Sequence, residues 1–217
     1  MENCRFEKTD MTTDKDLSTK EAILKAAEDE FLEKGYGNAK MLSIAKRAGV
    51  SHSMLHYYYS TKENLFQMIF QQKSTALSSI FDGIYESQLN FLETVRLISE
   101  AHFDFIAQIP NFPQIVNEVM QNSEYHQLFL DAVNPQLSGI YDKVDKLYKA
   151  EIEKGTVYEM KTRDLLMNIT APNVSFFVAL PLLKNILSIK DKNAYEAMLK
   201  EQRESNVRFV LNAIKKG

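Results

Sequence analysis

The sequence contains a single cysteine, Cys4, so no disulfide bond can form within the chain. Glycine and proline are also scarce, at 7 and 5 of 217 residues, and long segments contain neither. Because these two residues end helices and shape turns, their scarcity favours a fold made of long helices. The cysteine content fits a reducing compartment, and we expect a cytoplasmic protein.

The chain also lacks a long apolar segment. The longest, residues 174–183, is too short to span a bilayer and contains Pro181. Residues 1–17 are polar, without the apolar core of a signal peptide, and we expect them to form a flexible tail. We therefore predict no membrane partner. Separately, the net charge of −3 excludes a polycation that coats nucleic acid.

Residue combinations typical of catalysis are absent as well. There is no glycine-rich phosphate loop and no cluster of serine, histidine and aspartate. His52 and His56 have the spacing of two metal ligands on a helix, but no cysteine, aspartate or glutamate lies between them. We predict no catalytic residues, no metal, no cofactor and no enzymatic activity.

Apolar residues recur with the period of a helix over most of the chain, and no segment alternates like a strand. Ser18, with Glu21 three residues later, predicts the start of the first helix. The sequence therefore predicts an all-α fold. The expected helices cover 18–34, 41–48, 51–58, 61–85, 89–108, a segment ending near 122, 124–153 with a break near Pro135, 163–187 with bends at Pro172 and Pro181, and 192–215.

A tight turn joins the second and third of these helices. Gly49 fits the left-handed position that ends a helix, and Ser51 fits the N-cap of the next one. This order of elements is typical of a helix-turn-helix. The second helix of the pair carries an unusual row of histidines and tyrosines, residues 52–59, whose rings combine an apolar body with a hydrogen-bonding tip.

Residues 23–66 closely resemble the N-terminal DNA-binding domain of the TetR/AcrR transcriptional regulators. The resemblance implies a three-helix helix-turn-helix domain over 18–64, followed by a larger helical domain over 65–217 that binds a ligand and dimerises. The sequence departs from the family at two places. Ala39-Lys40 stands where the family usually has a Thr that caps the second helix, and Asn38 is a possible substitute cap. His56 stands where the family has Tyr. The matching positions are Ala26-Ala27, Phe31, Gly35-Tyr36, Ile44-Ala45, Ala48-Gly49-Val50-Ser51, Leu55, Tyr58-Tyr59, Lys62-Glu63 and Leu65.

A recognition helix in the major groove must present polar groups from its first turns to the base edges. Lys62 lies in the first turn of the following helix, where a phosphate oxygen is favoured. The resemblance implies contacts with bases or backbone for His56, Tyr57, Tyr58 and Lys62. The full set of predicted DNA-binding residues is Ser51, His52, Ser53, His56, Tyr57, Tyr58 and Lys62.

The larger domain offers candidates for the two roles that the resemblance implies. Segment 174–180 is apolar almost all round, as in a helix buried between its own core and a partner, although a buried helix within one chain has the same pattern. The predicted dimer residues are Phe176, Val178, Val207, Val210 and Ile214. The predicted ligand-pocket residues are His102, Phe103, Asn117, Gln121, His126, Asn173 and Phe177.

We therefore expect a homodimeric DNA-binding regulator, a repressor that a small hydrophobic or aromatic inducer releases from a palindromic operator. Two alternatives remain open at this point. The helical domain of such a regulator could respond to a protein partner, or the chain could be an all-α small-molecule-binding protein with an incidental helix-turn-helix.

Overall fold

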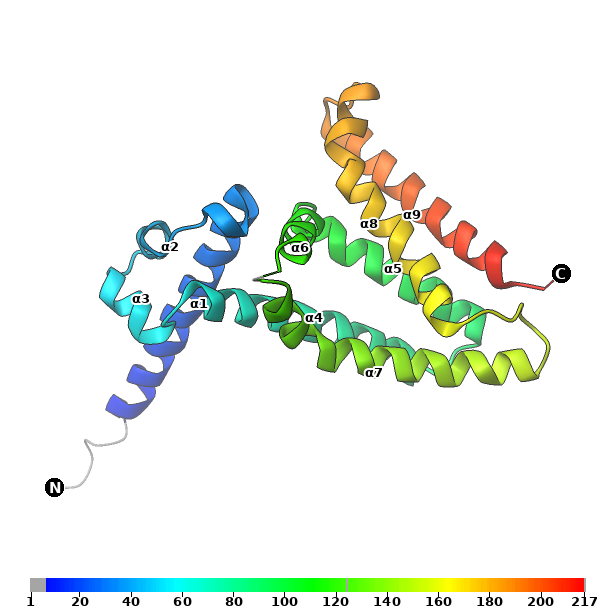
Figure 1. Cartoon of the computed structure of the whole chain (residues 1–217), viewed down its shortest axis with the longest axis horizontal. Coiled ribbons are helices and arrows are strands. Elements are labelled where there is room, and N and C mark those ends of the chain that lie inside the picture. The colour runs from blue at the N-terminus through cyan, green and yellow to red at the C-terminus, as the bar shows by residue number, and fades with distance from the viewer. Residues whose placement is uncertain (1–6, 124, 217) are drawn as a thin grey trace. The chain divides into compact units, whose positions relative to one another are not determined.

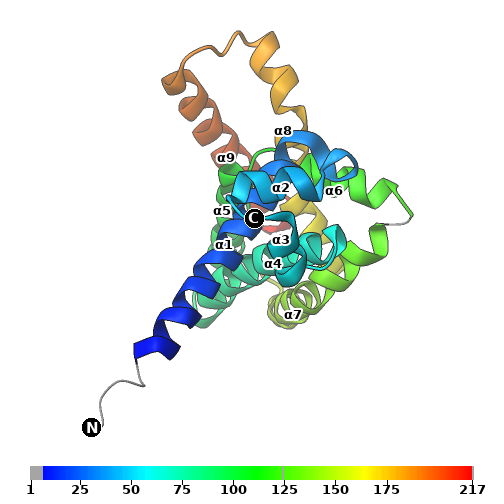
Figure 2. The same cartoon turned by 90° about the vertical axis from the view of Figure 1, so that its left-hand side faces the viewer.

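The computed structural model describes residues 7–123 and 125–216, and all regular secondary structure within them is helical. An isolated antiparallel bridge joins Val157 to Lys215. The chain divides into two compact units, and each is described by itself. The predicted all-α fold is confirmed, and Figures 1 and 2 show the helices from two directions.

The first unit comprises residues up to Gln72 together with Glu118–Ala132. It contains α1 (Glu7–Asn38), α2 (Met41–Ala48), α3 (His52–Tyr58) and the first part of α4 (Lys62–Glu86). The end of α6 and the start of α7 complete it. Apolar side chains of α1, α2 and α3 meet α4 in its core, in which Ile23, Phe31, Ile44, Leu55 and Phe66 are buried.

The second unit comprises Lys73–Asn117 and Val133–Gly217. Besides the rest of α4, it contains α5 (Phe91–Gln108), the first part of α6 (Phe112–Gln121), most of α7 (His126–Glu153), α8 (Thr162–Ile186) and α9 (Lys192–Ile214). One core cluster packs around Phe91, Tyr148 and Leu165, and a second around Phe103 and Phe177. The predicted bounds of these helices agree with the structure to within a few residues.

The prediction that the first helix starts at Ser18 is wrong: α1 begins at Glu7, residues 7–17 are helical, and Ser18 lies inside the helix. Residues 1–6 of the expected tail lie outside the described part. The first compact unit takes in α4 as far as Gln72 and residues 118–132, besides the helices of the predicted DNA-binding domain of residues 18–64. Sequence order alone gives no sign that this later segment returns to the first unit.

The returning segment brings a carboxylate to the end of α1. Gly35 interrupts the helix with φ 76° and ψ 164°, a conformation that is essentially restricted to glycine. The two backbone N–H groups that follow, of Tyr36 and Gly37, donate to the Glu118 carboxylate at 3.1 and 2.8 Å. Glu118 lies in α6, so this interaction joins residues far apart in the sequence within one unit.

We expect Gly35→Ala to destabilise the first unit by about 1–3 kcal/mol, because alanine is strained at this φ and ψ. A Cβ at this position would also lie 2.5 Å from Glu118 Oε2. The measurement is urea denaturation followed by circular dichroism.

Gly83→Ala is the matched control for this substitution. Gly83 lies inside α4, and a Cβ there meets no atom of the described structure within 4 Å. The same change should therefore stabilise the protein by about 0.5–1 kcal/mol. Equal effects at the two glycines would contradict the role given to Gly35.

Candidate DNA interface and candidate ligand site

Helix α3 presents almost all of its side chains to solvent. Leu55 is its buried residue, and the next buried position is Tyr59, the C-cap. Tyr57 is 81% exposed. The other exposed residues of the stretch are Ser51, His52, Ser53, Met54 and His56. Five of the seven predicted DNA-binding residues, Ser51, His52, Ser53, His56 and Tyr57, are therefore brought together on one solvent-facing surface, which we call the α3 face.

The turn before α3 has the predicted geometry. Gly49 has φ 70° in the left-handed region, and the Val50 N–H donates to the Ala45 carbonyl at 3.0 Å. The Ser51 hydroxyl accepts from the Met54 N–H at 3.1 Å, which caps α3. The predicted substitute cap for α2 is wrong: Lys40 is the N-cap residue, and the Asn38 side chain donates to the Lys34 carbonyl of α1.

Ion pairs hold α2 on α1. The Arg47 guanidinium donates to both carboxylate oxygens of Glu33, at 2.7 and 2.6 Å. It also lies 3.5 Å from the buried Glu30 carboxylate, to which Lys34 donates at 2.6 Å. Since α2 and the turn determine where α3 begins, these pairs contribute to the placement of the α3 face.

Tyr58 and Lys62 make contacts within the protein that sequence reasoning did not anticipate. The Tyr58 hydroxyl donates to Asp16 of α1 at 2.6 Å, and this hydrogen bond raises the pKa of Tyr58 above its ordinary value. The Lys62 ammonium donates to the carbonyl of Tyr36 at 2.9 Å and lies 4.4 Å from the centre of its ring. Lys62 therefore caps the end of α1, a structural role beside the predicted phosphate contact.

The second unit contains a small apolar cavity between α4, α5, α7 and α8. Its volume is about 20 Å³, the room needed by one water molecule. Lys143 and Asp82, which form an ion pair, lie at this cavity. The other lining residues are Phe81, Tyr85, Phe91, Thr94, Val95, Ile98, Ile140, Val144, Leu147 and Ile169.

None of the residues predicted for a ligand pocket lines this cavity. Phe103 and Phe177 belong to the core cluster between α5 and α8, and Asn117 is exposed on α6. Gln121 and His126 lie in the other unit. Half of the residues that line the cavity are aliphatic and lie at ordinary core spacing, so they carry no sequence signal that distinguishes a cavity from a packed core.

His102 and Asn173, the remaining two candidates, belong to a buried polar network. The Asn173 amide donates to the Ser99 carbonyl at 3.0 Å and lies 3.1 Å from His102 Nδ1. Asn206 of α9 donates to the Asn173 side-chain oxygen at 2.7 Å. Because the amide nitrogen of Asn173 can only donate, His102 Nδ1 must accept, which requires a neutral ring. Burial lowers the pKa of His102 to about 4, in agreement with this assignment.

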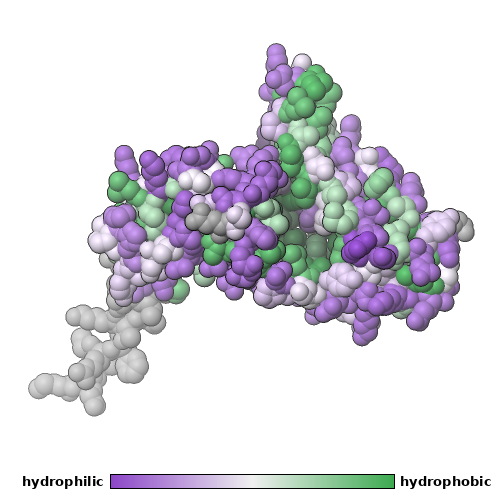
Figure 3. All heavy atoms as spheres, viewed as in Figure 1, coloured by the Kyte–Doolittle hydropathy of each residue, from purple (hydrophilic) through white to green (hydrophobic). Residues whose placement is uncertain are grey.

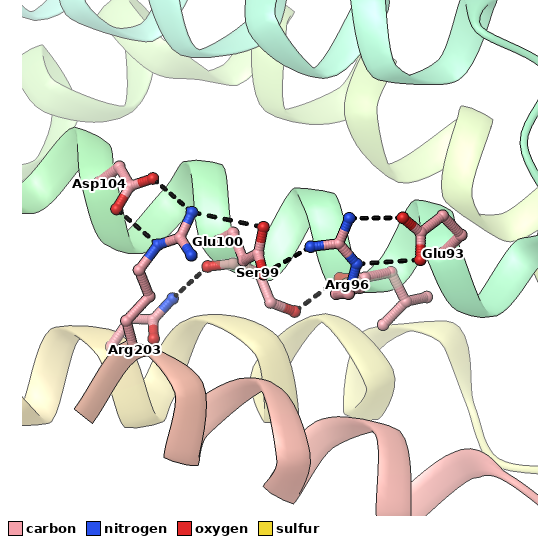
Figure 4. Close-up of polar contacts among 8 residues, drawn as sticks. Glu93, Arg96, Ser99, Glu100, Asp104 and Arg203 are labelled. Atoms are coloured by element: carbon pink, nitrogen blue, oxygen red, sulfur yellow. Dashed lines mark hydrogen bonds and ion pairs between the residues drawn. The ribbon is translucent and has the colours of Figure 1, made fainter. Parts of the chain in front are cut away.

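A row of charged residues joins α5 to α9 beside this network (Figure 4). Arg96 pairs with Glu93 and Glu100 along α5, and these hydrogen bonds raise its pKa above the ordinary value. Arg203 of α9 donates to both carboxylate oxygens of Asp104 at 2.8 Å. Together, the network and the ion pairs fix α9 against α5.

The residues predicted for dimerisation are mostly internal. Phe176, Val207, Val210 and Ile214 are buried in the core of the second unit, and only Val178 is exposed. Apolar character is shared by core and interface residues, so the sequence alone does not distinguish the two. The large exposed apolar residues of these helices are Met167, Val174, Val178, Leu182 and Ile186 of α8 and Phe209 of α9. Figure 3 shows hydrophobic residues gathered on α8.

Helix α8 is also long and apolar enough to cross a membrane by length and composition, with a mean hydropathy of 1.5 in its most apolar window. A third of that window is buried in the protein, and helices in the cores of soluble proteins meet the same criterion. Among the described residues, no group of three or more histidine, cysteine, aspartate or glutamate side chains could hold a metal ion.

Comparisons with known proteins agree with the geometry of the first unit. Residues 23–69 match the family described as bacterial regulatory proteins, tetR family. The fatty acid metabolism regulator protein of Bacillus subtilis is 23% identical over 63% of this chain and 70% of its own. The transcriptional activator FasR of Mycolicibacterium smegmatis is 34% identical, but over only 39% of this chain and 38% of its own.

The fold extends the likeness to almost the whole chain. The crystal structure of the regulator FadR from Bacillus subtilis in complex with stearoyl-CoA superposes with a TM-score of 0.67. The comparison covers 88% of this chain and 97% of that one, at 20% sequence identity. At this identity the likeness concerns the fold.

The buried network predicts how stability depends on pH. The pKa of His102 is about 4 in the folded chain against an ordinary value of 6.5, so below pH 6.5 the unfolded chain binds a proton that the folded chain excludes. The contribution of His102 to stability is therefore complete above pH 6.5 and declines as the pH falls toward 4. Between pH 7.5 and 5 we expect a loss of about 2 kcal/mol from this residue.

His102→Asn is the test, because its side-chain oxygen can replace Nδ1 as the acceptor while the group no longer titrates. Urea denaturation at both pH values should show a smaller loss for the variant than for the wild-type protein, by about 2 kcal/mol. Equal losses would contradict the assignment of a neutral, buried His102.

Proposed function

We propose that the chain is a DNA-binding transcriptional regulator of the TetR type, a homodimeric repressor that a ligand with an acyl chain releases from a palindromic operator. The α3 face supports the DNA-binding part of this proposal, because its polar side chains are exposed on a helix that buries only Leu55. The proposal places this helix in the major groove and the protein in the cytoplasm.

Dimerisation follows from the size of the recognition helix. A helix of 7 residues reads a few base pairs, so a specific site requires two copies, about 34–36 Å apart or a multiple of that spacing. We propose that α8 and α9 provide the two-fold contact. Val174, Val178, Leu182 and Ile186 follow one another at intervals of four residues on α8, and Leu182 and Ile186 are 62% and 66% exposed. Such a continuous apolar strip fits a self-complementary interface.

The apolar cavity of the second unit is the proposed ligand site. Its walls are hydrocarbon, which suits an acyl chain, and the structure of a fold relative contains stearoyl-CoA. Lys143 can bind an anionic head group in exchange for Asp82. At about 20 Å³ the cavity has no room for a chain, so binding requires α4 to move away from α5 and α7.

This movement supplies a mechanism for release. Helix α4 lines the cavity with Phe81 and Tyr85, and the same helix begins at Lys62, directly after the α3 segment. We propose that displacing α4 in both subunits changes the distance between the two α3 helices and spoils their fit to the operator. The ligand shifts this equilibrium only by its difference in affinity for the two arrangements.

Lys62→Ala tests the DNA contact. We propose that the Lys62 ammonium, held by the Tyr36 carbonyl, uses a remaining N–H to bind a phosphate. The slope of log affinity against log salt should then fall by about 0.9 per subunit, because one phosphate contact is lost. The control is Lys192→Ala on α9, whose side chain is 85% exposed in the other unit and whose loss should leave the slope unchanged.

An unchanged slope for Lys62→Ala in a correctly folded protein would remove Lys62 from the phosphate contacts. Thermal denaturation of the variant distinguishes this outcome from unfolding, since loss of the cap on α1 is expected to cost about 1–3 kcal/mol.

The ligand proposal is tested by thermal denaturation with stearoyl-CoA, shorter acyl-CoAs and CoA alone. An acyl-CoA at a hundred times its dissociation constant should stabilise the protein by about 2.7 kcal/mol and weaken operator binding, whereas CoA alone should do neither. Ile98→Phe, which fills the cavity, should reduce the effect of the acyl-CoA while leaving DNA binding intact.

If the protein binds its operator but no acyl-CoA stabilises it, the ligand proposal is wrong. The second candidate function, a DNA-binding regulator controlled by a protein partner, then becomes the better explanation of the second unit. The small volume of the cavity favours this alternative.

A further inference from the structure

The hydrogen bonds of His56 determine where its ring proton lies. His56 Nδ1 is 2.9 Å from the carbonyl oxygen of Ser60. A carbonyl oxygen can only accept, so Nδ1 must carry the hydrogen. In the neutral ring, the other nitrogen, Nε2, then has a free lone pair and is an acceptor.

The tautomer of His56 determines which nitrogen of His52 carries the hydrogen. Its Nε2 lies 3.2 Å from His56 Nε2, and the two rings are close, with their centres 4.4 Å apart. Because His56 Nε2 is the acceptor, His52 Nε2 must be the donor and carries the hydrogen of that ring. His52 Nδ1 is therefore an acceptor, and among the side chains of residues 16–123 and 125–216 none hydrogen-bonds to it.

The free acceptor lies where a base edge is expected. His52 is the first residue of α3 and is exposed. The N-terminal residues of a recognition helix are those that reach base edges in the major groove. In that groove only two base groups donate hydrogen bonds, the N6 amino group of adenine and the N4 amino group of cytosine, whereas guanine presents acceptors and thymine an acceptor and a methyl group.

We propose that His52 is a specificity-determining residue that selects adenine or cytosine at one position of each half-site, and that His56 is a positioning residue that fixes its tautomer. The proposal rests on the proposed DNA-binding function and adds the direction of one hydrogen bond. The Ser60 carbonyl, His56 and His52 form a relay in which each acceptor sets the donor of the next ring.

Two substitutions of His56 test whether its acceptor nitrogen fixes the tautomer of His52 or whether a ring of similar size is enough. The side-chain oxygen of glutamine can occupy the place of Nε2 and accept from His52, so His56→Gln retains the relay. The phenylalanine ring in His56→Phe has a similar size but no acceptor, so His52 can adopt either tautomer. His52→Ala removes the reading group itself.

The experiment is selection of bound duplexes from a library with randomised half-sites, at pH 8 with a metal chelator present, for the wild-type protein and the three variants. The wild-type protein should favour adenine or cytosine over guanine and thymine at one half-site position by about threefold to tenfold. His52→Ala should lose this preference at that position alone. His56→Gln should retain it, and His56→Phe should lose it while other positions keep theirs.

The outcomes distinguish this inference from the proposed function. The inference is overturned if a palindrome is selected but the position sensitive to His52 favours guanine or thymine, if His52→Ala alters no position, or if His56→Phe keeps the wild-type preference. Selection of no sequence over random duplex overturns the proposed function together with the inference.

A measurement without DNA tests the relay itself. Long-range nitrogen–proton NMR spectra of the four histidines at pH 8 should show His56 with its proton on Nδ1 and His52 with its proton on Nε2. His52 should become a mixture of tautomers in His56→Phe but not in His56→Gln. The opposite tautomer for either residue in the wild-type protein overturns the relay.

Discussion

The proposed DNA-binding surface depends on the packing of one side chain, Leu55. A helix of 7 residues is not stable in isolation, and α3 buries no other residue of its own. The Ser51 cap and the buried Tyr59 at its end hold the backbone, and Leu55 inserts into the core of the first unit. Because Leu55 is the buried contact of this helix, His52, Ser53, His56 and Tyr57 remain exposed, whereas Tyr58 is half-buried and donates to Asp16.

Tyr36 plays the corresponding role for the end of α1. Its N–H binds Glu118, its carbonyl binds Lys62 and its hydroxyl donates to Glu63 at 3.2 Å. Its buried ring contacts Phe31, Phe66 and Tyr125. Tyr36 thus contacts both the start of α4 and the segment that runs from the end of α6 to the start of α7. Helices α4 and α6 both continue into the second unit, and each places one side chain, Lys62 or Glu118, on the backbone of Tyr36.

Much of the first unit could be read from the sequence because its determinants are local. Gly49, Ser51 and the apolar period specify the helix-turn-helix within a short stretch, and the structure confirms them. The return of Glu118 to Gly35 could not be predicted, since a single glutamate far along the chain carries no signal of its partner. In the second unit, Phe176, Val210 and Asn173 were assigned by residue type, but burial depends on which neighbours pack against them. A core leucine and an interface leucine look alike until the helices are placed.

The central claim is that two α3 helices bind one duplex in consecutive major grooves. The most direct measurement compares the dissociation constants for the selected palindrome and for the same palindrome with about half a helical turn inserted between its half-sites. Both half-sites stay intact, but they then lie on opposite sides of the duplex. The account predicts that the insertion weakens binding toward that of random duplex, by on the order of 10³-fold at physiological salt. Equal affinity for the two duplexes would contradict it.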